Sequence, residues 1–333
     1  MSTTTTDLTT TAGPVGTELA GPEIVGFETE RSGLDARPIV FRTIARYAQA
    51  LDAARAKGLT VGVVPTMGAL HAGHASLIRR AAQECDLVAV SIFVNPTQFG
   101  DASDLANYPR TIHADLAVVA AAGGLVVFAP NVAEMYPPAR GRGSGGAVPT
   151  ERTISVPSLG ARWEGASRPG HFDGVATVVV KLLSAAGPCR AYFGEKDFQQ
   201  LAVVRRVVAD RSLPAEVVGC ETVRDVDGLA LSSRNALLAA PERAAATVLS
   251  RALRAGIALM AQGEDDPRRV ERAMELEVAA EPLVELDYAA VVQADDLEPV
   301  ATCAAERPLR LLIAARVGPV RLIDNLDPAT VPA

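Results

Sequence analysis

The chain has 333 residues, which is enough for two domains or for one domain with a large extension. Apolar residues make up 49% of it, so a sizeable core can form. The formal net charge of -7 argues against a broad nucleic-acid-binding face, although a local basic pocket for a triphosphate remains compatible with it. The cysteines Cys85, Cys189, Cys220 and Cys303 lie far apart, which predicts free thiols rather than a disulfide scaffold or a zinc knuckle.

The N-terminal residues 1–36 are rich in Thr, Gly and Pro and show no clear period, which predicts a disordered tail. They contain neither the basic region nor the apolar region of a secretory signal. No stretch reaches the roughly 18 uninterrupted apolar residues of a membrane span. We therefore expect a cytoplasmic protein with no membrane partner.

Residues 37–222 alternate between short apolar runs and helical patterns. Runs without polar alternation predict strands buried on both faces, at residues 61–64, 87–94, 125–129, 190–194 and 216–220. Helical patterns lie between them, from residue 74 onward and at residues 111–122, 175–183 and 197–209. The Gly-rich segment 130–146 is predicted to be an irregular loop or lid. This alternation is typical of an α/β fold with a Rossmann-like, doubly wound parallel sheet.

Residues 223–333 have a different character. They predict one long amphipathic helix over residues 241–260 and a second over residues 267–280. Strand-like runs follow at residues 286–292, 309–315 and 320–323. We expect a smaller C-terminal α+β lid domain with an antiparallel sheet.

The first candidate site is the turn after the run at residues 61–64. Its members are Pro65, Thr66, Met67, Gly68, His71, Gly73 and His74. Ligands bind at the carboxyl ends of strands in such folds, and the N-terminus of the following helix attracts phosphate. The pattern is neither a dinucleotide fingerprint nor a Walker loop. Two alternatives are that the histidines only cap and pack the turn, or that they bind zinc, for which further ligands are missing.

The second candidate site is the turn that contains Gly194, Lys196, Asp197 and Gln200. Lys196 suits a phosphate, Asp197 suits a helix cap, and Gln200 suits a substrate hydroxyl or carboxylate. A solvated charged cap is the alternative interpretation.

The third candidate site joins the two predicted domains. Val223 precedes it, and Leu231, Ser232, Ser233 and Arg234 form it. Two hydroxyls followed by a guanidinium can clamp a triphosphate. The alternative is a helix N-cap with a surface arginine.

The fourth candidate site follows the run at residues 87–94. Asn95 and Gln98 lie at the same predicted sheet edge as the first turn and suit a small polar substrate. Taken alone, this segment is also an ordinary turn.

Together these segments resemble the pantothenate synthetase (pantoate–β-alanine ligase) family over about residues 42–325. The resemblance is carried by PTMGALHAGH, FVNPTQFG, YPRT, RPGHFDGV, YFGEKDFQQL and GLALSSRN, which occur in the order of the family. It implies a nucleotidylyl transferase whose H-x-G-H turn binds ATP. Such an enzyme makes pantoyl adenylate from pantoate and ATP, transfers the pantoyl group to β-alanine, requires Mg²⁺ and forms a homodimer.

The resemblance also implies roles for individual residues. His74 would be the proton donor, and His71 would stabilise the phosphates. Gln98 and Gln200 would hold pantoate, with Gln98 also near β-alanine. The ATP site would be lined by the first turn from Met67 to His74, by Gly194, Lys196 and Asp197, and by Val223 and Leu231 to Arg234.

Two departures are visible. Leu231 stands where the family commonly has Met, a swap that conserves volume, and the Thr-rich N-terminal tail is an extension that the family pattern does not match. The metal ligands are not identified by any pattern. The alternatives are a plain nucleotidyltransferase acting on another small acid, a non-catalytic nucleotide-binding protein, and a tRNA-charging enzyme, which the acidic balance disfavours.

Overall fold

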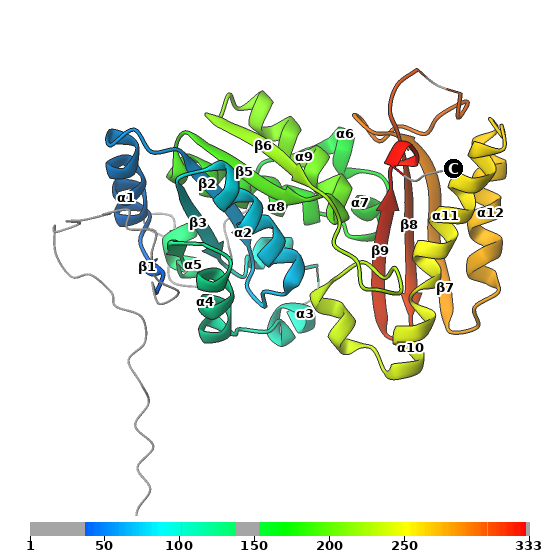
Figure 1. Ribbon diagram of the computed structural model, residues 1–333, viewed down its shortest axis with the longest axis horizontal. Helices are drawn as coiled ribbons and strands as arrows, with labels where there is room; N and C mark the ends of the chain where they lie inside the picture. The colour runs from blue at the N-terminus through cyan, green and yellow to red at the C-terminus, as the bar shows by residue number, and fades with distance from the viewer. Residues whose placement is uncertain (1–36, 101, 138–152, 305, 331–333) are drawn as a thin grey trace, which may run out of the picture.

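The computed structural model describes residues 37–100, 102–137, 153–304 and 306–330. The predicted tail at residues 1–36 and most of the predicted lid at residues 130–146 lie outside these ranges. Figure 1 shows two sheets side by side, the N-terminal one with helices around it and the C-terminal one with α11 and α12 on its outer side.

The N-terminal sheet is parallel throughout and has the strand order β1-β4-β3-β2-β5-β6. Its strands are β1 (Ile39–Phe41), β2 (Val61–Thr66), β3 (Leu87–Ile92), β4 (Val126–Phe128), β5 (Cys189–Gly194) and β6 (Ala215–Cys220). The five predicted strands are present, and the predicted fold class is confirmed. The short strand β1 was not predicted.

Successive side chains of these strands enter two different cores. Val63 and Phe128 pack with helices on one face, whereas their neighbours Val64 and Val127 pack with helices on the other. The first face carries α1 (Ile44–Ala56), α8 (His171–Ala186) and α9 (Phe198–Asp210), and the second carries α2 (Ala72–Glu84) and α4 (Ile112–Ala121). Because both faces are covered, the strands need apolar residues at every position, which explains their unbroken runs.

Short helical turns connect the larger elements. They are η1 (Pro96–Gln98), α3 (Ala102–Asn107), α5 (Val132–Met135), α6 (Pro157–Gly160), α7 (Glu164–Ser167), η3 (Glu195–Asp197), η4 (Ser233–Leu237) and η5 (Pro328–Thr330). The helix α5 corrects the prediction of an irregular segment from residue 130. The Asn131 side chain accepts a hydrogen bond from the Glu134 backbone N–H at 2.8 Å and so caps this single turn.

The C-terminal region pairs three antiparallel strands with two long helices, as predicted. The strands, in the order β7-β8-β9, are β7 (Val284–Gln293), β8 (Leu309–Val317) and β9 (Val320–Leu326). The helices are α10 (Ala240–Ala245), α11 (Val248–Ala261) and α12 (Pro267–Ala279).

The single helix predicted at residues 241–260 is wrong, because the chain breaks it into α10 and α11. The Thr247 hydroxyl donates to the Ala244 carbonyl at 2.7 Å, and the Thr247 N–H bonds to the same carbonyl. A threonine side chain that competes for the backbone in this way interrupts the regular helix pattern.

The stretch Ala240–Ala261 is also long and apolar enough to cross a membrane, judged by length and composition alone. Half of its apolar 18-residue window is buried within the protein, and Leu249, Leu253 and Ile257 lie in the C-terminal core. Buried helices of globular cores commonly share this length and composition.

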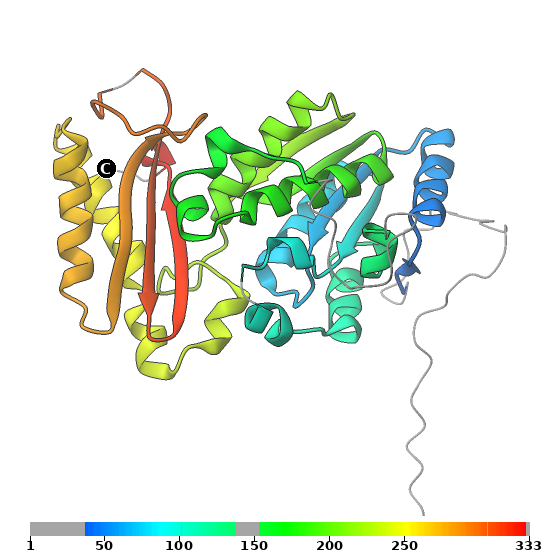
Figure 2. The same cartoon turned by 180° about the vertical axis from the view of Figure 1, so that it is seen from behind.

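The C-terminal sheet contributes to two cores. Val291 and Ile313 pack with α11 and α12, whereas Val292 and Leu312 pack with the N-terminal core that contains α8 and α9. Figure 2, seen from behind, shows the same sheet between these two groups of helices. The predicted domain boundary at residues 222 and 223 stays a prediction, but the two regions meet through apolar side chains.

Candidate active site

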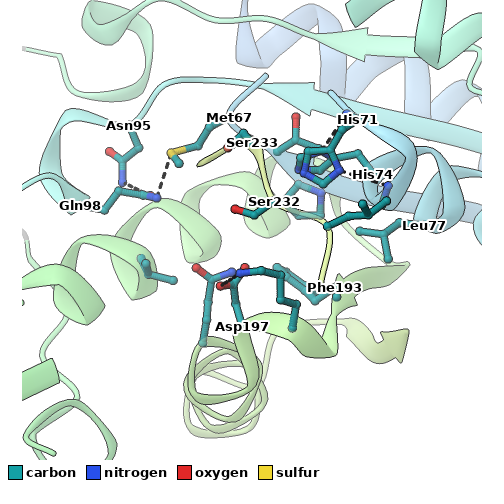
Figure 3. A pocket seen from close by; sticks show the side chains of 18 of the residues that line it. Met67, His71, His74, Leu77, Asn95, Gln98, Phe193, Asp197, Ser232 and Ser233 are labelled. Atoms are coloured by element: carbon teal, nitrogen blue, oxygen red, sulfur yellow. Dashed lines mark hydrogen bonds and ion pairs between the residues drawn. The ribbon is translucent and has the colours of Figure 1, made fainter. Parts of the chain in front are cut away.

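A cavity of about 220 Å³ opens at the carboxyl ends of β2, β3, β5 and β6. Strands β2 and β5 are neighbours in the sheet, and the chain leaves them toward opposite edges, which makes this the switch point where α/β folds bind ligands. The predicted site residues line this cavity, with the exception of Gly68 and of Ala69, Leu70 and Ala72 in the turn from Met67 to His74. In Figure 3, His71 and His74 lie at one end of the cavity, and Asn95 and Gln98 lie at the other.

The two histidines of the first turn form a reciprocal cap at the start of α2. The His71 Nδ1 accepts a hydrogen bond from the Gly73 N–H at 3.1 Å, and the His74 Nδ1 accepts one from the His71 N–H at 3.3 Å. A Cβ at Gly73 would lie 2.8 Å from the His71 Cε1, so glycine leaves the room that this ring needs. The capping alternative is therefore realised in the structure, and it does not compete with ligand binding.

This cap determines which ring nitrogens can bind a ligand. Since each Nδ1 accepts from a backbone N–H, a neutral ring carries its proton on Nε2. Burial lowers the pKa of His71, with a further contribution from the Lys196 charge. Burial and the neighbouring His71 lower the pKa of His74 to about 3. Both imidazoles are thus neutral at neutral pH and present Nε2–H groups as donors.

The loop before α2 is shaped by Gly68 and by a carboxylate that the sequence patterns missed. Gly68 adopts φ +85, a conformation that disfavours other residues, and it lies behind the cavity wall rather than in it. The buried Asp115 of α4 accepts hydrogen bonds from the backbone N–H groups of Ala69 at 3.2 Å and Leu70 at 2.8 Å. Gly68 therefore shapes the loop, and its predicted contact with a ligand stays a prediction.

Lys196 and Asp197 enter the cavity from the turn that links β5 to α9. Their charged atoms, Nζ and Oδ1, are 3.7 Å apart. Burial opposes ionisation of Asp197, but the charges of Lys196 and Arg234 outweigh it, so the pKa of Asp197 falls below its ordinary value. The carboxylate is therefore ionised beside two cations. Asp197 makes no side-chain cap bond to α9, so the helix-cap interpretation is not realised.

Gln98 is held in place by Asn95. The Asn95 Nδ2 donates to the Gln98 Oε1 at 3.0 Å and to the Gly174 carbonyl at 3.2 Å. The Asn95 Oδ1 accepts from the Thr97 hydroxyl and from the Tyr136 hydroxyl, at 2.9 and 2.8 Å. Both ends of this buried amide are thus used by the protein, so Asn95 positions Gln98, and its predicted contact with a substrate stays a prediction. The Gln98 Nε2 itself lies 2.9 Å from the Met67 sulfur.

The segment from Val223 to Arg234, at the predicted domain junction, closes the cavity. The Leu231 N–H donates to the Val223 carbonyl at 2.9 Å, which brings this segment back beside β6. The Ser232 hydroxyl accepts from the Arg234 N–H at 3.2 Å and caps η4. The predicted N-cap and the predicted cavity wall are therefore the same residues.

Several lining residues were not singled out from the sequence. They are Leu77, Phe93, Tyr108, Val175, Val178, Val179, Leu182, Phe193, Glu221 and Thr222. The α8 residues among them read as ordinary core positions, because a wall of valine and leucine carries no chemical pattern. Thr222 has a buried hydroxyl oxygen for which the described residues supply no hydrogen-bond partner.

Within the described residues, no group of three or more His, Cys, Asp or Glu side chains could hold a metal ion. The zinc interpretation of His71 and His74 therefore has no further ligands in the part of the chain that is described.

The chain is similar to known proteins over most of its length. A family model described as Pantoate-beta-alanine ligase matches residues 39–327. A pantothenate synthetase from Rubrobacter xylanophilus is 54% identical, over 81% of this chain and 92% of the relative. The crystal structure of pantothenate synthetase from Thermus thermophilus is 46% identical with a TM-score of 0.77, and it covers 87% of this chain and 99% of that one.

A third similar structure is described with ligands bound. It is the pantoate-β-alanine ligase from Francisella tularensis, complexed with β-γ ATP and β-alanine, at 32% identity and a TM-score of 0.69. The alignment covers 89% of this chain and 100% of that one. The chain therefore belongs to the pantoate-β-alanine ligase family.

Proposed function

We propose that this ligase condenses (R)-pantoate with β-alanine to pantothenate, through a pantoyl adenylate, with release of pyrophosphate and AMP. The observation that carries the proposal is one cavity with two chemically different ends. At one end, His71 and His74 present two neutral imidazole donors. Lys196 lies close enough for its charge to lower the pKa of His71. The uncharged amide of Gln98 lies at the other end (Figure 3). A phosphate chain and a small hydroxy acid require these two environments.

The phosphate end suits the first step. Attack of a pantoate carboxylate oxygen on the α-phosphorus of ATP breaks the bond to pyrophosphate and adds negative charge to the phosphoryl oxygens. Lys196 and Arg234 offset that charge, and the Nε2–H groups of His71 and His74 donate hydrogen bonds to it. Because the imidazoles are neutral, the buried site carries no unpaired histidine charge before ATP binds.

The other end suits the acid. The Gln98 Nε2 can exchange its contact with the Met67 sulfur for an oxygen of pantoate, which is a stronger acceptor. Gln200 lines the same cavity and supplies a second amide. The valine-rich wall of α8, with Val175 and Val179, suits the apolar part of such an acid.

The second step needs orientation more than it needs a further catalytic group. The neutral amine of β-alanine attacks the acyl carbon, the bond from that carbon to the phosphate oxygen breaks so that AMP leaves with the electron pair, and the nitrogen releases one proton to solvent. Holding the amine beside the adenylate can account for much of the rate.

Magnesium is proposed to accompany ATP. Mg²⁺ prefers oxygen ligands and is commonly held by one or two carboxylates together with substrate phosphates and water. The acidic side chains among the lining residues are Asp197 and Glu221, and Asp197 is ionised beside the phosphate end. These two would hold the ion, which would neutralise phosphate charge.

We further propose a cytoplasmic homodimer with a domain division at residues 222 and 223. Among the residues that the structure describes, Leu229 is the first to lie in the C-terminal core, which supports that division. Sedimentation of the purified protein would test the homodimer.

The function is tested by a product assay with ATP, Mg²⁺ and D-pantoate, with and without β-alanine. Equal amounts of AMP and pantothenate that form only with β-alanine are expected. Pyrophosphate release with no effect of the amine would favour a nucleotidyltransferase acting on an acid. An absence of turnover would contradict the proposed substrates.

A further inference from the structure

The turn that carries Lys196 is held by a residue from the other sheet. The Nδ2 of Asn325, on β9, donates to the Glu195 carbonyl at 2.9 Å and to the Lys196 carbonyl at 2.8 Å. Asn325 is 2% exposed. One amide thus satisfies two consecutive backbone carbonyls of η3, a turn too short to satisfy them itself.

Arg310 fixes the orientation of that amide. Its Nε donates to the Asn325 Oδ1 at 2.7 Å, which forces the Asn325 Nδ2 toward η3. Its Nη2 donates to the Glu195 Oε2 at 3.0 Å, and its guanidinium lies 4.2 Å from the centre of the Phe198 ring. The support of the Lys196 turn is therefore rigid on both sides.

The residue before Asn325 holds the opposite wall of the cavity. Asp324 is 3% exposed and forms a bidentate ion pair with Arg224, at 2.6 and 2.8 Å. The backbone of Arg224 forms an antiparallel β-bridge with Ala230. Directly after this bridge, the chain returns to the cavity at Leu231. Asp324 thereby anchors the base of the loop that delivers Ser232 to Arg234.

We infer that Asp324 and Asn325 form a clamp that sets the distance between Lys196 and the Ser232–Arg234 segment. The inference rests on the proposed function, since both walls must reach one phosphate chain. Neither residue of the clamp lines the cavity, so both are positioning residues. A misplacement of about 1 Å in a reacting group can reduce a rate on the order of 100-fold.

The test uses the full chain and the adenylation step, followed as pantoate-dependent pyrophosphate formation with enzyme in excess over ATP. Asn325→Ala is expected to lower the adenylation rate about 10- to 100-fold. Val320→Ala is the matched control, because Val320 lies on the same strand, is buried, and packs in the C-terminal core away from η3. It should lower the melting temperature and leave the rate within about threefold.

A double-mutant cycle separates positioning from a general loss of structure. If Asn325 acts through Lys196, then adding Asn325→Ala to Lys196→Ala should slow the reaction little further. Losses that multiply would overturn the inference, and so would an unchanged rate in Asn325→Ala. If Asn325→Ala does not fold, Arg310→Lys replaces it, with a smaller loss and the same dependence on Lys196 expected.

The other arm of the clamp is tested by Asp324→Asn, which keeps the volume and weakens the pair with Arg224. The KM for ATP should rise, and the rise should largely disappear when Arg234→Ala is already present. A rise of the same size in both backgrounds would contradict this arm. A wild-type protein that forms no adenylate would contradict the proposed function instead, so the two failures are distinguishable.

Discussion

His71 and His74 use one ring nitrogen for the helix and leave the other for a ligand. Serine and glutamate usually make such a reciprocal cap. With histidines in these positions, the cap itself orients two donors toward the cavity. His71 and His74 therefore contribute both to the stability of α2 and to the chemistry of the site.

Replacement of His74 separates these two contributions. His74→Ala removes both the Nε2 donor and the Nδ1 cap acceptor, whereas His74→Asn keeps an acceptor near the Nδ1 position. Both should lose most of the adenylation rate, but only the alanine variant should lose about 0.5–2 kcal/mol of stability. The measurements are pyrophosphate formation and urea denaturation. Full activity in either variant would show that the Nε2 donor is dispensable.

The pKa of His74 predicts the direction of acid sensitivity. An unfolded histidine takes up a proton near pH 6.5, whereas folded His74 does so near pH 3. The unfolded state binds more protons between these values, so the free energy of unfolding should fall as the pH drops from about 6.5 toward 3. His171, whose pKa burial and Arg168 lower to about 4, acts in the same direction. The drop in the urea midpoint from pH 7 to pH 4.5 should be smaller in His74→Asn than in the wild-type protein. A drop of the same size in both proteins would assign the acid sensitivity to other groups.

At the residue scale, the sequence was informative where a site is built from neighbours in the chain. The turn at residues 65–74 and the Lys196 turn were predicted because their members are a few residues apart. Asp115 and Asn325 act on loops 45 and 129 residues away, and no local pattern reveals such contacts. The apolar wall of α8 was missed because a valine that lines a cavity has the same sequence pattern as a valine in a core.

At the scale of elements, the contact between α8 and η1 positions Gln98. A Cβ at Gly174 of α8 would lie 2.3 Å from the Thr97 carbonyl oxygen, so only glycine allows the two elements to approach this closely. The His171 Nδ1 donates to the Gln98 carbonyl at 2.8 Å across the same contact.

Gly174→Ala should push η1 away from α8. We expect a loss of about 1–3 kcal/mol of stability and a higher KM for pantoate, because Gln98 moves with the turn. Gly100→Ala is the control, since nothing lies within 4 Å of a Cβ at that position. An unchanged KM in Gly174→Ala would show that η1 tolerates the shift.

Elements were predictable in proportion to their length and burial. The strands of the parallel sheet were recognised because two covered faces demand unbroken apolar runs. The strand β1 has three residues, Ile39–Phe41, which is too short a run to register as a pattern. The break between α10 and α11 falls in an alanine-rich stretch of high helix propensity, and it depends on the hydroxyl of Thr247.

At the scale of the whole molecule, a buried ion pair joins the two regions. Arg321 of β9 binds both oxygens of Glu164 in α7, at 2.6 and 2.7 Å, and Glu164 is 6% exposed. Tyr288 donates to the same carboxylate at 3.0 Å. The contact between the regions is thus polar at this point, where Ser167 also donates to Asp287 at 3.1 Å, and apolar where Val292 and Leu312 pack.

Removal of one partner should be costly, because it leaves the other charge buried. Arg321→Ala should lose about 3–5 kcal/mol in urea denaturation. Arg251→Ala, which breaks an exposed pair with Glu277, should change the midpoint little. Similar midpoints for the two variants would mean that water replaces the lost partner of Glu164.

The position of Asn325 has a consequence for synthesis of the chain. A ribosome releases the parallel sheet first, and domains generally form as they emerge. The cavity walls from β2 to η4 are then present, but the lysine turn gains its support only when β9, the last strand of the described chain, has been made. Nascent chains and chains clipped before β9 lack both Asp324 and Asn325, so they are expected to bind ATP weakly and to use it slowly.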